Sequence, residues 1–277
     1  AADLSPTTIR SYYTRVAGLF SYAVDEDLLV RSPCRGDLGL PSGGPRRRRP
    51  IVTAETVHTI AEALPDAYRP VAYLGALGLR RAEVFGLQVG DLNFPASTLT
   101  VRQAATVVAG KLLIGPPKTE KSKRTIQVPA DIMAFLGQHL AEQGRQHEPD
   151  GYVVQAPKGG PVRADLFRQR VWIPAVIAAG LGEMVEHTDS DGVKTETFAG
   201  LGLHDLRHGA VAMMAAAGVP VEVASRRVGH STITTTADIY GSLPKAADEK
   251  AAEALGDLFS EAARASAENR PVASAED

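Results

Sequence analysis

The chain has 277 residues, of which 44% are hydrophobic and 22% are charged, a composition typical of folded soluble proteins. Its single cysteine, Cys34, excludes an intrachain disulfide and fits a reducing interior, so we expect a cytoplasmic protein. The first residues lack a signal-peptide pattern, and the longest apolar stretch, near residues 210–219, is too short to cross a bilayer, so we do not expect a membrane protein.

Positive charge is concentrated locally rather than spread along the chain. The net charge is −2, but residues 245–277 hold eight acidic and four basic residues, so the rest of the chain carries +2. A DNA-binding protein needs a basic region on its surface, whereas its total net charge need not be positive. Two basic clusters could supply one: Arg46, Arg47, Arg48 and Arg49 in an unbroken run, and the group Lys111, Lys118, Lys121, Lys123 and Arg124.

Residues 6–27 are predicted to form an amphipathic helix. Ser5 can cap the helix, and Pro6 suits the first helical position. Hydrophobic residues then recur at helical spacing: Ile9, Tyr12, Tyr13, Val16, Leu19, Phe20 and Val24. One helix and a short follower bury too little surface to form a core alone.

Residues 41–52 are predicted to form a basic linker, because proline and glycine interrupt both helices and strands. Its four arginines would lie over phosphates if two lobes of the protein clamp a DNA duplex. The same composition fits a solvated charged linker or a nuclear localisation signal, and these interpretations stay open.

After the linker, the sequence predicts a mainly α-helical region with one small antiparallel β-sheet. Thr53 caps the first of three expected helices, over residues 53–64, 66–77 and 81–87. Alternation of β-branched residues between Thr98 and Val128, with turns at Gly110-Lys111 and Gly115-Pro116-Pro117, predicts the sheet.

From Ala130 onward the pattern is again helical, interrupted by a short strand expected near residues 152–155. Residues 186–200 are polar and predict a loop or hairpin. An apolar stripe predicts a last helix over residues 247–265, followed by a disordered end.

Side chains suited to phosphodiester chemistry occur in separated motifs: Gly78-Leu79-Arg80, His204-Asp205-Leu206-Arg207-His208, Val228-Gly229-His230-Ser231, and Tyr240. The transition state of phosphoryl transfer concentrates negative charge on the non-bridging oxygens, so fixed positive donors lower the barrier. We assign this role to the guanidinium groups of Arg80 and Arg207, which bind phosphate bidentately and stay charged.

His204 and Arg207 are three residues apart, so on a helix they share one face. We assign His204 and His230 as hydrogen-bond donors to the phosphate or the attacking oxygen, with His204 as the proton acceptor. Tyr240 is the proposed nucleophile. A phenol with a pKa of about 10 is ionised to only about one part in a thousand at neutral pH, so neighbouring groups must assist its deprotonation.

The order of these motifs resembles the tyrosine recombinase (phage integrase) family, from about Thr53 onward. The first box is the run from Gly78 to Leu87, the hairpin lysine is in Pro117-Lys118-Thr119, and the second box spans His204 to Tyr240. The resemblance implies the DNA breaking-rejoining fold and site-specific recombination or integration of phage or mobile-element DNA. It also implies transesterification through a 3′-phosphotyrosyl link, without metal or cofactor.

The resemblance further assigns Lys118 as the general acid that protonates the departing 5′ oxygen. Lys121 and Lys123 compete for this role, and with Arg124 they are expected to contact DNA. Glu83 lies one turn beyond Arg80 and is expected to orient or neutralise an arginine.

The family's organisation implies three parts and a linker. Residues 1–40 would be the C-terminal remnant of a helical (SAM-like) core-binding domain, 53–244 the catalytic domain, and 245–277 a C-terminal helix and tail. That helix would dock either into a neighbouring protomer or on its own core. The implied partners are double-stranded attachment sites, a homotetramer on DNA, and accessory DNA-bending or directionality factors.

The same motifs allow three other interpretations. His204 and His208 superficially resemble the His-Glu-x-x-His helix of zinc proteases, but this leaves Arg80, Lys118 and Tyr240 without a role. A type IB topoisomerase uses a similar phosphate cage, although the step of ten residues from His230 to Tyr240 favours a recombinase. A catalytically silent DNA-binding fragment is the third alternative.

Overall fold

The computed structural model describes residues 4–36, 38–41, 50–117, 122–188, 192–230 and 232–241. Contacts between Cα atoms divide the chain into two compact units, residues 1–49 and 50–277. The boundary falls inside the segment 41–52. The predicted DNA contacts Arg46, Arg47, Arg48 and Arg49, and the predicted terminal helix over residues 247–265, lie outside the described residues.

The first unit contains one helix, α1 (Pro6–Asp25), close to the predicted range. The Ser5 hydroxyl accepts a hydrogen bond from the Thr8 backbone N–H at 3.2 Å, so the predicted cap is present. No residue of α1 is buried, and Leu19 in its apolar stripe is 66% exposed. The described part of this unit therefore has no core of its own.

The second unit begins with short helices: α2 (Ala54–Ala63), the 3-10 turn η1 (Asp66–Tyr68), α3 (Pro70–Ala76) and α4 (Arg81–Gly86). Thr53 caps α2 as predicted, by accepting from the Thr56 backbone N–H. The single helix predicted over residues 66–77 is wrong, because Pro70 has no N–H to continue the turn and starts a new helix instead. Gly78, with a φ of +96°, separates α3 from α4.

The predicted single sheet is two sheets. One has three antiparallel strands in the order β1-β2-β5: β1 (Leu92–Asn93), β2 (Thr98–Val101) and β5 (Arg124–Gln127). The other is the hairpin of β3 (Ala104–Val108) and β4 (Lys111–Gly115). Ala109 and Gly110 both have positive φ in the turn of this hairpin, the backbone conformation that a two-residue connection needs.

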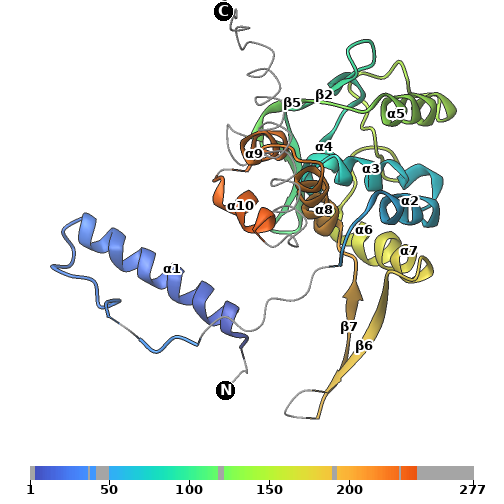
Figure 1. Cartoon of the computed structure of the whole chain (residues 1–277). Coiled ribbons are helices and arrows are strands. Elements are labelled where there is room, and N and C mark those ends of the chain that lie inside the picture. The colour runs from blue at the N-terminus through green and yellow to red at the C-terminus, as the bar shows by residue number, and fades with distance from the viewer. Residues whose placement is uncertain are drawn as a thin grey trace, which may run out of the picture. The chain divides into compact units, whose positions relative to one another are not determined.

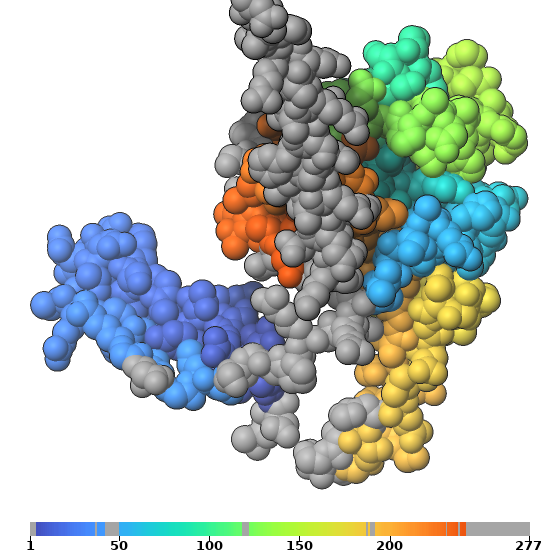
Figure 2. All heavy atoms as spheres, in the orientation of Figure 1, coloured from blue at the N-terminus to red at the C-terminus, as the bar shows by residue number. Residues whose placement is uncertain are grey.

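The middle of the unit carries α5 (Ala130–Glu142), α6 (Ala164–Phe167), the π-helical turn η4 (Arg168–Trp172) and α7 (Ile173–Ala178). The strand predicted at residues 152–155 is wrong, because Tyr152 and Gln155 form only isolated bridges, to Gln88 and Pro161. The polar segment after α7 is a hairpin of β6 (Gly182–Thr188) and β7 (Lys194–Gly200). It projects from the α6–α7 end of the unit (Figures 1 and 2).

The last described elements are α8 (Leu203–Ala216), α9 (Val221–Val228) and α10 (Thr234–Tyr240). A 3-10 turn, η2 (Val89–Asp91), lies far upstream, just before β1, and packs on β2. Helix α8 packs on α3, where Gly75 leaves room for Leu206, since a Cβ there would come within 2.9 Å of the Leu206 Cδ1. Gly209 of α8 likewise has no room for a Cβ, because Val52 lies directly against it.

The described helices of the second unit pack around one hydrophobic core, and α8 lies in the centre of this core. Fully buried side chains from α2, α3, α5, α8 and η4 meet there, among them Ile60, Leu74, Leu136, Trp172 and Leu206. The fold is mainly α-helical with small antiparallel sheets, as the sequence predicted. None of the described helices is long and apolar enough to span a bilayer.

Candidate active site

Arg207 lies in the second turn of α8 and is almost fully buried, with 1% of its surface exposed. Its Nη1 donates to the Gly78 carbonyl oxygen at 2.5 Å, whereas its Nη2 has no hydrogen-bond partner in the described part of the chain. Burial, together with Arg80 and Arg124, lowers the pKa of Arg207 to about 9, while Glu83 opposes the shift. The group is therefore a charged, incompletely bonded donor at neutral pH.

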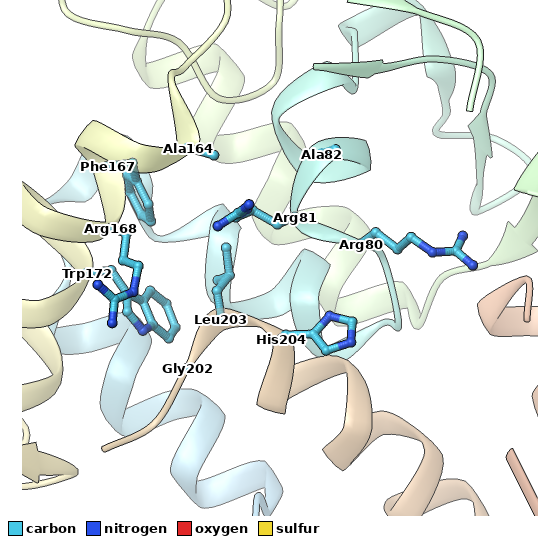
Figure 3. Close-up of a pocket in the computed structure, with 10 residues that line it drawn as sticks. All are labelled: Arg80, Arg81, Ala82, Ala164, Phe167, Arg168, Trp172, Gly202, Leu203 and His204. Atoms are coloured by element: carbon cyan, nitrogen blue, oxygen red, sulfur yellow. The ribbon is translucent and has the colours of Figure 1, made fainter. Parts of the chain in front are cut away.

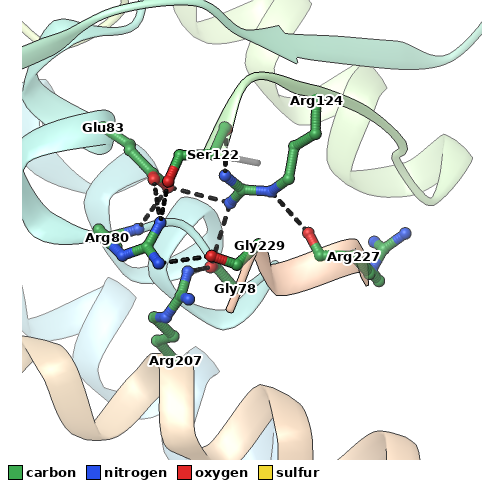
Figure 4. A network of polar contacts seen from close by, with 8 residues as sticks. All are labelled: Gly78, Arg80, Glu83, Ser122, Arg124, Arg207, Arg227 and Gly229. Carbon is green, nitrogen blue, oxygen red and sulfur yellow. Dashed lines mark hydrogen bonds and ion pairs between the residues drawn. The ribbon is translucent and has the colours of Figure 1, made fainter. Parts of the chain in front are cut away.

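Arg80 comes to the same place from the start of α4, across 127 residues of chain. Its Nη1 donates to the Glu83 carboxylate at 2.7 Å and to the Ser122 hydroxyl at 3.1 Å. Its Nη2 donates to the Gly229 carbonyl oxygen at 2.5 Å. Figure 4 shows the guanidinium groups of Arg80 and Arg207 facing each other, so the structure unites the two predicted phosphate-binding arginines.

Glu83 is the anion that holds this cluster together. Its carboxylate is 2% exposed and pairs with Arg80 at 2.7 Å and with Arg124 at 2.9 Å. Burial alone would raise the pKa of Glu83, but the hydrogen bonds and charge of Arg124 and the hydrogen bonds from Arg80 outweigh burial and lower the pKa. Glu83 orients two arginines, in line with the role expected from its position.

Arg124 differs from the predicted DNA contact and instead belongs to the interior of the site. Its side chain is 6% exposed. Besides Glu83, its guanidinium donates to the carbonyl oxygens of Arg227, at 2.6 Å, and Ser122, at 2.9 Å. With its donors committed to the protein and its surface covered, Arg124 braces β5 against α9, and we reassign it as a positioning residue.

Gly78 supplies a shared acceptor. Its carbonyl oxygen accepts from Arg207 at 2.5 Å and from Arg124 at 3.5 Å. Its φ of +96° is strained for any other residue, and a Cβ would come within 2.8 Å of Val228 Cγ1. The glycine of the first box is therefore required by both backbone conformation and space.

His230 follows the end of α9, where Gly229 adopts a left-handed conformation with a φ of +70°. Its Nδ1 shares a hydrogen bond of 2.7 Å with the Thr236 hydroxyl. Burial, followed by the charges of Arg207, Arg80, His204 and Arg124, lowers the pKa of His230 to about 4. The imidazole is neutral at physiological pH and lies close to the arginine cluster.

His204 starts α8 one turn before Arg207 and is exposed. Its ring packs edge-on against His208, with centroids 4.6 Å apart. It lines a pocket of about 470 Å³ together with Arg80 (Figure 3). His204 thus lies at the open side of the cluster, where a ligand would approach.

Tyr240 is the last residue of α10, and its hydroxyl donates to the Val219 carbonyl oxygen at 2.8 Å. Val219 lies beyond the C-terminal end of α8, whereas Arg207 lies near its start. At 1.5 Å per residue, the helix advances about 13 Å between Arg207 and its last residue, Ala216. The phenol is therefore docked away from the arginines in this conformation, although both belong to one packed group of helices.

Of the hairpin lysines, Lys118 and Lys121 lie outside the described residues. Lys123 is exposed and lines a second pocket, of about 380 Å³, with His230 and Arg226. Lys123 thus lies near His230, on the connection between β4 and β5.

Sequence reasoning did not find Ser122, Thr236 or the carbonyl oxygens of Gly78 and Gly229, which bond directly to predicted site residues. Gly78 and Gly229 carried a signal, since both belong to the quoted motifs, whereas Ser122 and Thr236 carried none. In the described ranges, no three His, Cys, Asp or Glu side chains are grouped to hold a metal ion. The zinc interpretation therefore lacks a third described ligand beside His204 and His208.

The chain matches known proteins over most of its length. The family model described as "Phage integrase family" matches residues 70–246. The ICEBs1 integrase of Bacillus subtilis is 26% identical over 269 residues, covering 92% of this chain and 67% of the relative. The integrase of Mycobacterium phage L5 is 26% identical over 257 residues, covering 91% and 63%. The chain thus spans about two thirds of the length of these relatives.

Solved structures show the same fold. The Tn1549 transposon integrase in complex with transposon right end DNA aligns with a TM-score of 0.68 at 20% identity, over 92% of this chain and 81% of that one. The XerH site-specific recombinase bound to a palindromic difH substrate aligns with a TM-score of 0.57 at 18% identity, over 91% and 65%. With the family model covering most of the chain and the paired arginines in place, this protein belongs to the phage integrase family.

Proposed function

We propose that this chain is a site-specific DNA recombinase that breaks and rejoins strands by transesterification at phosphorus. The observation that carries the proposal is the buried Arg207, whose Nη2 has no partner among the described residues, beside Arg80. Arg207, Arg80 and Arg124 share one carboxylate, Glu83, so the buried cluster has an excess of positive charge, which is costly unless an anion arrives with the substrate. A phosphodiester supplies that anion.

In the proposed reaction, Arg207 and Arg80 bind the non-bridging oxygens of the scissile phosphate. His204 accepts the phenolic proton of Tyr240, whose oxygen attacks phosphorus and forms a phosphotyrosyl bond. The bond to the 5′ oxygen breaks, and that oxygen takes a proton from a general acid. The reverse steps, with a 5′ hydroxyl of another strand, rejoin the DNA, and the phosphoester energy is conserved throughout.

The general acid is proposed to be Lys118, with Lys123 as the alternative, because Lys123 lies beside His230 in the second pocket. The neutral His230 is suited to donate a hydrogen bond to the phosphate or the attacking oxygen. Glu83 and Arg124 position Arg80 and take no part in bond making.

The solved structures support DNA as the partner, since the Tn1549 transposon integrase is in complex with transposon right end DNA and XerH is bound to a palindromic difH substrate. We propose that the DNA is double-stranded. We extend the proposal to a homotetramer on DNA attachment sites, with accessory bending or directionality factors. In it, residues 1–40 end a core-binding domain and residues 245–277 are exchanged between protomers. The relatives come from bacteria and their phages, so we expect the protein to act in the cytoplasm.

The proposal is tested by covalent trapping. The protein is incubated with a library of nicked duplexes whose central positions are randomised, so that cleavage next to the nick releases a short fragment and prevents rejoining. We expect a DNA adduct that resists denaturation, and peptide mapping should place the DNA on Tyr240. An adduct on another residue would overturn the nucleophile assignment. Exchange of strands between two intact duplexes that carry the selected target sequence would then separate a recombinase from a topoisomerase, which relaxes supercoils without exchange.

A further inference from the structure

Beside the arginine cluster lies a pocket of about 470 Å³ that the proposed chemistry does not use. Arg80 and His204 form its border with the active site, and Arg81 and Arg168 reach into it. Figure 3 shows that Arg80 and Arg81 leave the start of α4 in opposite directions, with Arg80 toward the arginine cluster and Arg81 toward η4. The pocket is therefore a separate, adjoining compartment.

The charges in the pocket have one sign. No Asp or Glu is among the described residues that line it. Among the described residues, neither Arg81 nor Arg168 forms an ion pair. The Arg168 guanidinium instead lies over the Phe198 ring, 5.8 Å from its centroid. Two guanidinium groups at one cavity, with a third at its border, call for an anionic ligand.

The far wall of the pocket is hydrogen-bonded to the segment that leads into α8. It is formed by the π-helical turn η4, which supplies Arg168 and Trp172. The Trp172 Nε1 donates to the Leu201 carbonyl oxygen at 2.8 Å, two residues before α8 begins. π-Helical turns are rare and occur frequently at functional sites. The wall and His204 therefore hold a fixed relation to each other.

From these observations we infer that the pocket binds the nucleotide next to the scissile phosphate, with Arg81 and Arg168 on that nucleotide's own phosphate and the partly exposed Ala82 and Leu203 against its apolar part. The inference rests on the proposed function, because Arg80 and His204 fix the scissile phosphate at the border of the pocket. Along one strand of a duplex the next charge follows after a rise of about 3.4 Å, so the cleaved strand must continue past this border. If the strand continues into the basic pocket, its next phosphate neutralises Arg81 and Arg168.

Trp172 makes the inference directly testable, because it is the only tryptophan in the chain and it lines the pocket. The full chain carrying Tyr240→Phe, which cannot cleave by the proposed route, is titrated with a 30-base-pair duplex of arbitrary sequence while tryptophan emission and DNA anisotropy are recorded. We expect the emission to change in step with binding. The double variant Arg81→Ala/Arg168→Ala should bind roughly tenfold more weakly and lose the emission change at saturation.

The salt dependence of affinity gives a second measurement. If both arginines bind one phosphate, the slope of log affinity against log salt should fall by about 0.9 in the double variant. Arg170→Ala is the matched control, since Arg170 is an exposed arginine of the same turn that does not line the pocket. This control should keep the full emission change at saturation.

An emission unchanged by saturating DNA, or a change that survives in the double variant, would overturn the inference. The two proposals fail in different ways. Absence of a covalent adduct with the trapping library would defeat the proposed function even if Trp172 responds to DNA. A normal covalent adduct in the parent, together with a Trp172 emission in the Tyr240→Phe protein that saturating DNA leaves unchanged, would defeat the pocket alone.

Discussion

The Tyr240 hydroxyl donates to the Val219 carbonyl oxygen at 2.8 Å, at the end of α8 opposite to Arg207. Burial raises the pKa of this phenol, and the nearby Glu222 carboxylate raises it further. The conformation thus keeps the proposed nucleophile protonated, bonded and remote from the phosphate site. Attack requires α10 to shift, which breaks this hydrogen bond and brings the phenol toward the arginines.

Tyr240→Phe should abolish the covalent DNA adduct and leave DNA affinity nearly unchanged, because the phenol contributes chemistry rather than charge. Loss of the bond to Val219 should lower the free energy of unfolding by about 1 kcal/mol, the usual value of one hydrogen bond. Denaturing electrophoresis and urea titration measure the two effects. An adduct formed by Tyr240→Phe would show that another residue attacks.

Arg207→Ala should slow strand cleavage by about 10²–10³-fold, since it removes a fixed donor aimed at the developing charge. Arg207→Lys tests geometry separately from charge. The lysine keeps the positive charge but lacks the planar guanidinium, which can bond Gly78 through Nη1 and offer Nη2 to the phosphate at the same time. Strand cleavage by this variant should therefore also be strongly impaired. Single-turnover adduct formation at saturating DNA is the measurement, and near-normal cleavage by the lysine variant would contradict a bidentate role.

Glu83→Gln should destabilise the protein and slow cleavage together. The substitution leaves Arg124 and Arg80 without their buried carboxylate, a change that costs about 3–5 kcal/mol in buried ion pairs. Glu62→Gln is the matched control, because Glu62 pairs with Arg69 at 3.6 Å on the surface and should change stability by less than about 1 kcal/mol. Equal effects of the two substitutions on unfolding and cleavage would refute the positioning role.

The stability of the fold should decrease as the pH falls from about 6.5 to about 4. The folded-state pKa of His230, about 4, lies below the ordinary value of 6.5, so within this window the unfolded chain binds a proton that the folded protein excludes. The contribution is fully present above pH 6.5 and is lost toward the folded pKa. Allowing for partial exposure, we expect about 1–2 kcal/mol.

Comparison of urea unfolding at pH 7 and pH 4.5 in the parent and in His230→Gln measures this contribution, because Glu83 and other carboxylates add their own pH dependence to both proteins. Between pH 7 and pH 4.5, the free energy of unfolding should change less in His230→Gln than in the parent. An identical pH dependence in both would show that His230 titrates normally.

The sequence could predict which residues form the arginine cluster, because short motifs carry them. His204 and Arg207 lie one helical turn apart, as their spacing requires, and Thr53 and Ser5 cap helices as their side chains favour. These predictions depend on local chemistry, which a sequence displays directly.

Features that depend on tertiary packing were out of reach of the sequence. Arg124 reads as part of a basic surface cluster, and only the position of Glu83 explains its burial. The docking of Tyr240 on Val219 depends on how α10 packs against α8 and α9. Residues 152–155 have the composition of a strand but gain only isolated bridges, because no neighbouring strand aligns with them.

Val52, at the start of the second unit, fills the space left by the missing side chain of Gly209. Gly209 lies two residues after Arg207 on α8, so the chain joins the second unit against the same helix that presents the phosphate-binding arginine. Any side chain at position 209 would push Val52 away from α8, and the displacement would reach Arg207 through the same helix.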